Sequence, residues 1–223
     1  MLISPPSSEK ELLERAFALA GKTLGDLSRE WNQTLPDSLV YAKGWIGQLL
    51  EKALGAQAGS LDQPDFIDLG IELKTLPITE NGHPCESTFL CSVTLPNHER
   101  DFYQSRAWHK LARILWIPVL MLPDRSIPQR RIGTPLLWSP SEHLAATLQQ
   151  DWEEIIELIT LGHFDQLDAH KGQYLQIRPK AANSKTLIKV VNHTGETISI
   201  VPKGFYLRVE LTKTIIHENY III

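Results

Sequence analysis

Two acids and a lysine at close spacing are the residues in this sequence whose types point to chemistry. Asp65 follows Pro64 and precedes Glu72-Leu73-Lys74, which gives the pattern PD-x6-ELK. Glu72 and Lys74 are two residues apart on an expected strand, so their side chains leave the same face, and Asp65 can fold back beside them. Two converging carboxylates form an oxygen site suited to Mg²⁺. An adjacent ammonium can hold or activate a water aimed at a phosphate, so the pattern favours phosphodiester hydrolysis.

The context of this pattern adds to its weight. Pro-Asp followed within about thirty residues by an acid-x-Lys triplet occurs by composition in on the order of one chain in ten. Here Glu72-Leu73-Lys74 is the only such triplet in the chain. It also lies among Ile67, Leu69 and Ile71, where an unused charged side chain is costly. A surface hairpin with an incidental ion pair remains the alternative.

Further residues could complete the acidic site or hold DNA. Glu51 lies on an expected helix over residues 44–54, which could pack beside the hairpin and bring a third carboxylate. A solvent-facing acid is the alternative. Arg178 and Lys180 flank a proline at a strand end. An arginine on a rigid turn can pair with guanine in the major groove, whereas a lysine suits a phosphate.

Two more segments carry DNA-binding candidates. An expected helix over residues 106–113 places Lys110 near His109 and Arg113, which would suit a contact with the DNA backbone. On an expected strand over residues 205–211, alternation points Tyr206 away from its apolar neighbours and towards a ligand. A structural or solvated role is the alternative for each of these residues.

Charge is segregated along the chain, although its net value is only −4. Residues 142–168 contain seven acids and no Lys or Arg, and residues 169–194 contain five bases and no acid. Residues 106–131 contain six bases and one acid. This segregation predicts a positive face on a protein that is acidic elsewhere, with solvated helix surfaces as the alternative.

Other function classes have no motif here. The sequence has no P-loop, GxSxG or GxGxxG pattern, which argues against nucleotide-driven or serine-hydrolase chemistry. Its eight histidines show no HxH or HExxH spacing, so we expect no histidine metal site. No apolar run approaches the roughly 20 residues of a membrane span. The two cysteines, Cys85 and Cys91, have no CxxC spacing, which suggests a reducing compartment and a cytoplasmic protein.

Hydrophobic periodicity predicts an α/β fold with partly antiparallel strands. Helices are expected over residues 8–20, 23–31, 44–54, 139–162 and 184–191. Strands are expected over residues 65–69, 71–75, 87–95, 115–120, 174–178, 197–201 and 205–211. Thr23 and Asp26 have the spacing of a capping box, and Gly70 permits a tight turn between the first two strands.

Several longer runs resemble the MutH family of bacterial mismatch-repair endonucleases. They extend from about residue 10 to the C-terminus and are more specific together than PD-x6-ELK alone. They are the runs KGWIG at 43–47, LGAQAGS at 54–60, LGIELKT at 69–75, LWIPV at 115–119, QRRIG at 129–133, PLLWSP at 135–140, YLQIRPKAAN at 174–183 and GFYL at 204–207.

The resemblance implies a restriction-endonuclease-like fold, in which helices flank a mixed sheet and two lobes form a DNA-binding cleft. It implies one nuclease domain over residues 1–223, with an approximate catalytic lobe over 1–100 and a DNA-recognition lobe over 101–223. Members of the family nick the unmethylated strand at hemimethylated GATC sites, using Mg²⁺, when the repair proteins MutS and MutL call them. We expect a monomer that acts on double-stranded DNA.

The resemblance also assigns roles to residues. Asp65, Glu72 and the carbonyl of Leu73 would bind magnesium, Lys74 would orient or activate the water, and Glu51 would support a second metal position. Lys43 and Phe89 resemble residues at the cleavage site and in the DNA groove, and Arg178 and Tyr206 resemble readers of GATC and of adenine methylation.

Two alternatives stay open. One is a restriction endonuclease of the same superfamily that cuts both strands without repair partners. The other is a non-catalytic DNA-binding module, although such a module has no need for two carboxylates near phosphates.

Overall fold

The structure is a computed structural model that describes residues 3–36, 39–59, 61–95, 99–121, 126–180 and 186–220, without the side chains of 39–43. Contacts divide the chain into two compact units. Unit 1 comprises Met1–Glu86, Ala112–Ser139 and Ile215–Ile223, and unit 2 comprises Ser87–Leu111 and Pro140–Thr214. Both units contain residues from before and after residue 100, whereas the expected lobes were residues 1–100 and 101–223.

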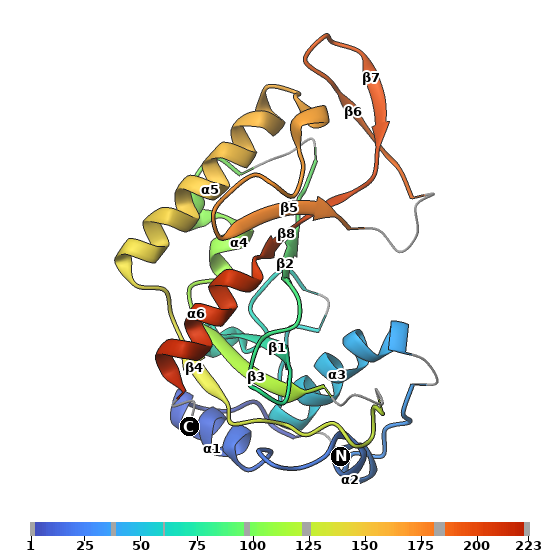
Figure 1. Ribbon diagram of the computed structural model, residues 1–223, viewed down its shortest axis with the longest axis vertical. Helices are drawn as coiled ribbons and strands as arrows, with labels where there is room; N and C mark the ends of the chain where they lie inside the picture. Colours follow the sequence, from blue (N-terminus) through green and yellow to red (C-terminus); the bar gives the residue numbers. More distant parts are fainter. Residues whose placement is uncertain are drawn as a thin grey trace. The chain divides into compact units, whose positions relative to one another are not determined.

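Unit 1 is built on a three-stranded sheet. Strand β3 (Ile114–Leu120) is central, parallel to β1 (Glu72–Ile78) and antiparallel to β4 (Leu136–Trp138) (Figure 1). β3 is buried from Ile114 to Val119, as its continuous apolar run predicts for a strand covered on both faces. In this register Glu72 pairs with Ile114 and Lys74 with Trp116, which fixes where the acidic end of β1 lies.

Three helices accompany this sheet in unit 1. They are α1 (Glu9–Phe17), α2 (Leu24–Glu30) and α3 (Leu39–Leu54). The predicted capping box of α2 is confirmed, because Thr23 and Asp26 each accept a hydrogen bond from the other's backbone N–H. α3 contacts α1, α2 and β1. One apolar core joins these elements, and it includes Leu12, Leu27, Leu49, Leu50, Leu54, Phe66, Ile71, Leu115 and Ile117.

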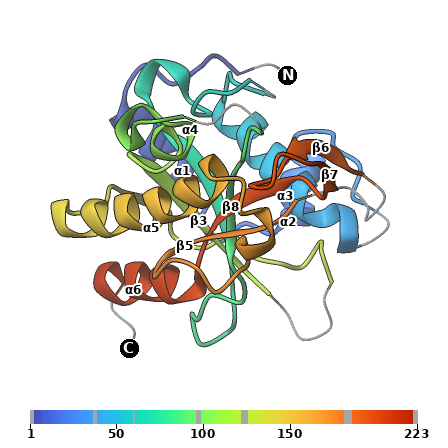
Figure 2. The same cartoon turned by 90° about the horizontal axis from the view of Figure 1, so that it is seen from above.

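Unit 2 is built on an antiparallel sheet. Strand β8 (Lys203–Leu207) lies between β2 (Thr88–Ser92) and β5 (Leu175–Pro179). The long helix α5 (Glu142–Thr160), capped by Ser141, contacts β5. A separate hairpin pairs β6 (Ile188–Val191) with β7 (Thr197–Ile200). Both strands of this hairpin lie side by side in the two perpendicular views of Figures 1 and 2.

The remaining helices are short or join the units. α4 (Arg106–His109) and the 3-10 helix η2 (Phe102–Gln104) belong to unit 2, as does η3 (Phe164–Gln166). α6 (Val209–Asn219) begins in unit 2, and the boundary between the units falls after Thr214. The predicted α/β class with partly antiparallel strands is confirmed. None of the helices in the described ranges is long and apolar enough to cross a membrane.

The strand expected over residues 65–69 is wrong. Residues Ile67–Leu69 form the 3-10 helix η1, closed by Gly70 with a φ of +64°. Phe66 and Ile71 pair across this turn. The residues between this pair form a helical turn in place of a strand, and Gly70 tolerates the left-handed backbone that closes it.

Two later predictions are also wrong. The helix expected over residues 184–191 is the strand β6 in its described part, because the β-branched residues Ile188, Val190 and Val191 pair with β7; residues 184–185 lie outside the described residues. The strand expected over 205–211 ends at Leu207, and α6 follows from Val209. Leu211, Ile215 and Ile216 are buried at helical spacing. The alternating pattern of the preceding strand made this helical period hard to recognise in the sequence.

Candidate active site

The turn at η1 folds Asp65 back onto the start of β1. The Phe66 N–H donates to the Ile71 carbonyl at 2.9 Å, and the Ile71 N–H donates to the Phe66 carbonyl at 3.3 Å. This pairing lets Asp65 Oδ2 accept a hydrogen bond from the Leu73 N–H at 2.8 Å. The Asp65 carboxylate is therefore held beside the backbone between Glu72 and Lys74.

Glu72 and Lys74 lie on one face of β1, as their spacing predicts. Lys74 Nζ lies 2.5 Å from Glu72 Oε1, and the two side chains are 14% and 3% exposed. A carboxylate this deeply buried is costly unless it is paired. The Lys74 ammonium compensates the Glu72 charge, and the Leu73 N–H stabilises the charge on Asp65, which is itself 7% exposed.

The other two candidates of unit 1 lie on α3. Glu51 is half-buried in the last turn of the helix, one turn after Gly47, and α3 contacts β1. A Cβ added to Gly47 would lie 3.7 Å from Glu51 Oε1, at ordinary van der Waals distance, so this carboxylate lies over the Gly47 position of the helix. Lys43 lies in the first turns of α3, and its side chain lies outside the described residues.

This donor set fits a hard divalent cation. Asp65 and Glu72 are carboxylates more than nine-tenths buried, and the Leu73 backbone links them. Carboxylate and carbonyl oxygens are the ligands that Mg²⁺ prefers, whereas a transition metal would favour imidazole or thiolate. Neither histidine nor cysteine is among these residues.

Four of the predicted DNA-binding residues lie together on the sheet of unit 2. The Phe89 and Tyr206 rings meet edge to face, with centroids 5.2 Å apart. Lys180 Nζ lies 4.1 Å from the Phe89 ring centroid, and Arg178 Cζ lies 5.6 Å from that of Tyr206. The strands explain this grouping, because β8 carries Tyr206 between β2, which carries Phe89, and β5, which carries Arg178. Two cations thus lie over an aromatic pair, in contacts that favour these positions of the Arg178 and Lys180 side chains.

Local contacts set the chemical state of this aromatic-cationic cluster (Phe89, Arg178, Lys180 and Tyr206). Burial raises the pKa of the Tyr206 phenol, while the Arg178 charge opposes that shift. The phenol therefore stays neutral at ordinary pH and can both donate and accept a hydrogen bond. The Arg178 guanidinium donates to Ser87 Oγ at 2.7 Å, so Ser87 orients it.

The predicted helical face at residues 106–113 is wrong. α4 ends at His109, and Lys110 is its half-buried C-terminal cap. Arg113 lies in unit 1, where its guanidinium pairs with both carboxylate oxygens of Glu9 at 3.0 and 2.8 Å. Lys110 and Arg113 therefore do not share a helix face, because the chain leaves the helix after one turn.

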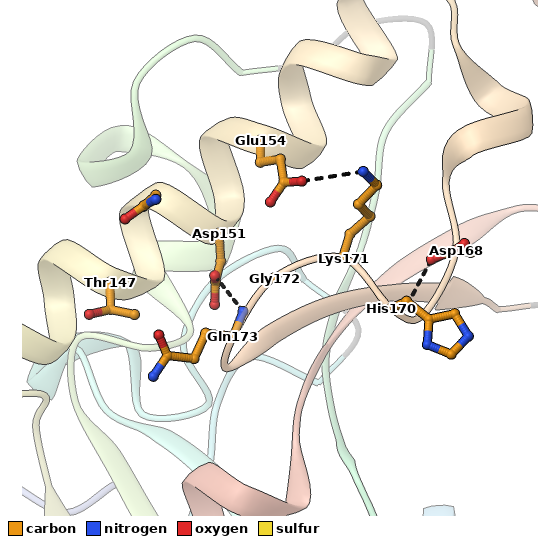
Figure 3. A pocket seen from close by; sticks show the side chains of 9 residues that line it. Thr147, Asp151, Glu154, Asp168, His170, Lys171, Gly172 and Gln173 are labelled. Carbon is orange, nitrogen blue, oxygen red and sulfur yellow. Dashed lines mark hydrogen bonds and ion pairs between the residues drawn. The ribbon is translucent and has the colours of Figure 1, made fainter.

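Sequence reasoning missed Asp151, which anchors the strand that carries Arg178. Its carboxylate accepts hydrogen bonds from the N–H groups of Gln173, Tyr174 and Leu175 at 2.6, 2.7 and 2.8 Å. Asp151 lines a polar cavity of about 510 Å³. Figure 3 shows it near the ion pair of Glu154 with Lys171. The sequence carried a sign of this role, because Asp151 falls within the apolar stripe of α5 that is buried (Leu148, Trp152, Ile155 and Ile159).

A mixed α/β fold with a Pro-Asp turn and a Glu-x-Lys strand places the protein in the restriction-endonuclease-like class. A family model described as "DNA mismatch repair enzyme MutH" matches residues 54–151. Two relatives from strains of Escherichia coli, each called "DNA mismatch repair protein MutH", are 46% identical over 224 residues, which is 99% of this chain and 97% of theirs. The chain belongs to the MutH family.

Proposed function

We propose that this protein is a Mg²⁺-dependent endonuclease that nicks the unmethylated strand of hemimethylated GATC sites in mismatch repair. The observation that supports the proposal is that Asp65, bonded to the Leu73 N–H, and the buried ion pair of Glu72 with Lys74 lie at the start of β1. Membership of the MutH family supports the same activity. A binding module would have no reason to bury two acids where a phosphate must approach.

The proposed roles follow from the donor set. Asp65, Glu72 and the Leu73 carbonyl would hold Mg²⁺, and Glu51 would support a second metal position. A bound Mg²⁺ supplies a water of lowered pKa and neutralises charge that grows on the phosphodiester. Lys74, held at 2.5 Å by Glu72, would orient or activate that water. Burial of the site excludes bulk water, which strengthens each of these charge interactions.

The aromatic-cationic cluster of unit 2 would read the DNA. Arg178 would contact a guanine edge and Lys180 a phosphate. Tyr206 would pack against adenine N6, where an added methyl group removes a hydrogen and adds bulk. Phe89 would line the groove, Lys43 would act near the cleavage site, and Lys110 would contact the DNA backbone.

The proposal extends to the form and partners of the protein. A monomer with one nuclease domain over residues 1–223 would bind double-stranded DNA. MutL, and MutS through it, would bring the enzyme to its site in the cytoplasm.

Nicking of methylated plasmids tests this function. We expect Mg²⁺-dependent nicking of unmethylated and hemimethylated GATC plasmids, none on fully methylated ones, and stimulation by MutL. Glu72→Ala should lower the rate at least about a hundredfold while DNA affinity is kept. Asp68→Ala is the matched control, because Asp68 is an exposed acid on the same turn. Among the described residues, its carboxylate accepts a hydrogen bond from the Gln57 side chain at 3.1 Å.

The outcome separates the remaining possibilities. Double-strand cleavage without partners would identify a restriction endonuclease instead. Residual turnover by Glu72→Ala near the rate of Asp68→Ala would contradict the assignment of the acidic site.

A further inference from the structure

Two histidines far apart in the sequence lie together in unit 2. Among the described residues, one ring nitrogen each of His163 and His193 and one carboxylate oxygen of Asp165 lie within 4.8 Å of one another. The imidazole centroids are 4.6 Å apart, with an angle of 31° between the rings. Spacing along the chain, from which no histidine metal site was expected, does not reveal this cluster, because His193 reaches His163 from the turn of the β6–β7 hairpin.

The end of α5 explains how these residues meet. Gly162 follows α5 with a φ of +74°, and its carbonyl accepts a hydrogen bond from the His193 N–H at 3.1 Å. A Cβ at Gly162 would lie 2.6 Å from His193 N, so only glycine lets the turn of the β6–β7 hairpin approach this closely. η3 then begins immediately after His163 and carries Asp165 in its first turn.

The His163 ring gives a second, independent indication. Its Nδ1 is buried and has no hydrogen-bond partner among the described residues. A buried ring nitrogen without a partner destabilises a fold, and coordination of that nitrogen to a cation would remove the cost. Asp165 and His193 are exposed, so a cation from solution can reach the cluster and their side chains can rotate towards it.

We propose that His163, Asp165 and His193 bind a late first-row transition-metal ion such as Zn²⁺. Imidazole nitrogens favour such ions over Mg²⁺. Two nitrogens and one carboxylate oxygen leave a fourth position of a tetrahedral site for water. None of these residues belongs to the proposed Mg²⁺ site, so this metal site stands independently of the proposed nuclease function.

A cation here would join η3 to the turn of the β6–β7 hairpin. This hairpin lies in the chain between β5, which carries Arg178, and β8, which carries Tyr206. Bound metal would therefore brace the segment that links two residues of the aromatic-cationic cluster. The site would act as a structural clamp, and its effect on the hairpin can be measured without any nuclease assay.

Competition titration of the full chain with Zn²⁺ and a chromophoric chelator, in a large excess of Mg²⁺, tests the site. The excess Mg²⁺ keeps Zn²⁺ from the carboxylates of the acidic site. We expect one high-affinity Zn²⁺ equivalent, and at least about a tenfold loss of affinity in His193→Asn and in Asp165→Asn. His170→Asn is the matched control, because His170 is an exposed histidine of unit 2 outside the cluster and should leave Zn²⁺ affinity unchanged.

Limited trypsin digestion gives a second readout, at Lys189 on β6. Zn²⁺ should slow cleavage after Lys189 in the wild type and in His170→Asn, but not in His193→Asn. Because His193 and Asp165 are exposed, their variants should fold, which circular dichroism can check. Equal Zn²⁺ affinity in His193→Asn and His170→Asn, or Zn²⁺ binding that leaves cleavage at Lys189 unchanged, would overturn the proposal.

Discussion

Replacing Asp151 with asparagine tests whether one buried carboxylate holds the strand that carries Arg178. Asp151 is 5% exposed, and its two carboxylate oxygens accept three backbone N–H groups, from Gln173, Tyr174 and Leu175. Asparagine keeps the size of the side chain but replaces one acceptor oxygen with an NH₂ donor. At least one backbone N–H therefore loses its acceptor and faces a donor instead.

The size of the effect follows from these bonds. A hydrogen bond to a charged acceptor contributes about 1.5–3 kcal/mol, and loss of one such bond leaves a buried donor without a partner. The bonds that remain lose the assistance of the charge, which is about half of their strength. We therefore expect Asp151→Asn to lower the free energy of unfolding by about 3 kcal/mol.

Urea denaturation of the variant, followed by tryptophan fluorescence, measures this loss as a shift of the midpoint at constant slope. Glu154→Gln is the matched control, because Glu154 lies on the same helix and forms an ion pair with Lys171 at the surface, with 3.4 Å between Oε1 and Nζ. With side chains 48% and 36% exposed, that ion pair should contribute no more than about 0.5 kcal/mol. A loss in Asp151→Asn below about 1 kcal/mol, or equal to that in the control, would refute the reasoning.

Three further predictions concern the proposed active site and the DNA readers. Lys74→Arg keeps the positive charge beside Glu72, but arginine cannot transfer a proton. The variant should therefore lose most nicking activity while its Mg²⁺ affinity is unchanged. A nicking rate near that of the wild type would mean that Lys74 contributes only its charge. Arg178→Ala should cost about 1–3 kcal/mol of DNA-binding free energy and relax specificity at one base. Lys180→Ala should weaken binding to all DNA sequences alike and reduce the salt dependence of binding, as measured by filter binding. Tyr206→Ser should narrow the rate difference between unmethylated and methylated strands more than it lowers DNA affinity, and unchanged strand-resolved nicking of hemimethylated GATC would leave Tyr206 as a packing residue.

Short-range patterns in the sequence predicted the features that depend on neighbours along the chain. The period of two on a strand placed Glu72 and Lys74 on one face, where they form an ion pair. The spacing of Thr23 and Asp26 gave the capping box of α2. The α/β class followed from the same periodicities, and the long runs that resemble the MutH family pointed to the family to which the chain belongs.

Features that depend on contacts between distant segments could not be read in this way. Residues 184–191 carry an ambiguous apolar run, and only pairing with β7 makes the described part of it a strand. The sequence predicted Lys110 and Arg113 on one helix face. In the structure the helix ends at His109, and Arg113 pairs with Glu9. Periodicity reports the preference of a segment, and tertiary pairing overrides it where the two differ.

The amino-acid sequence by itself determined the PD-x6-ELK pattern, the α/β class and the resemblance to the MutH family. Tertiary structure alone decided which side chains from distant segments lie together. It placed Arg178 beside Tyr206 across paired strands, and it brought His193 to His163 across thirty residues of chain. The physical reason is that strand pairing and the approach of a hairpin to Gly162 are set by backbone hydrogen bonds and close packing between segments, which leave no periodic signal in either segment alone.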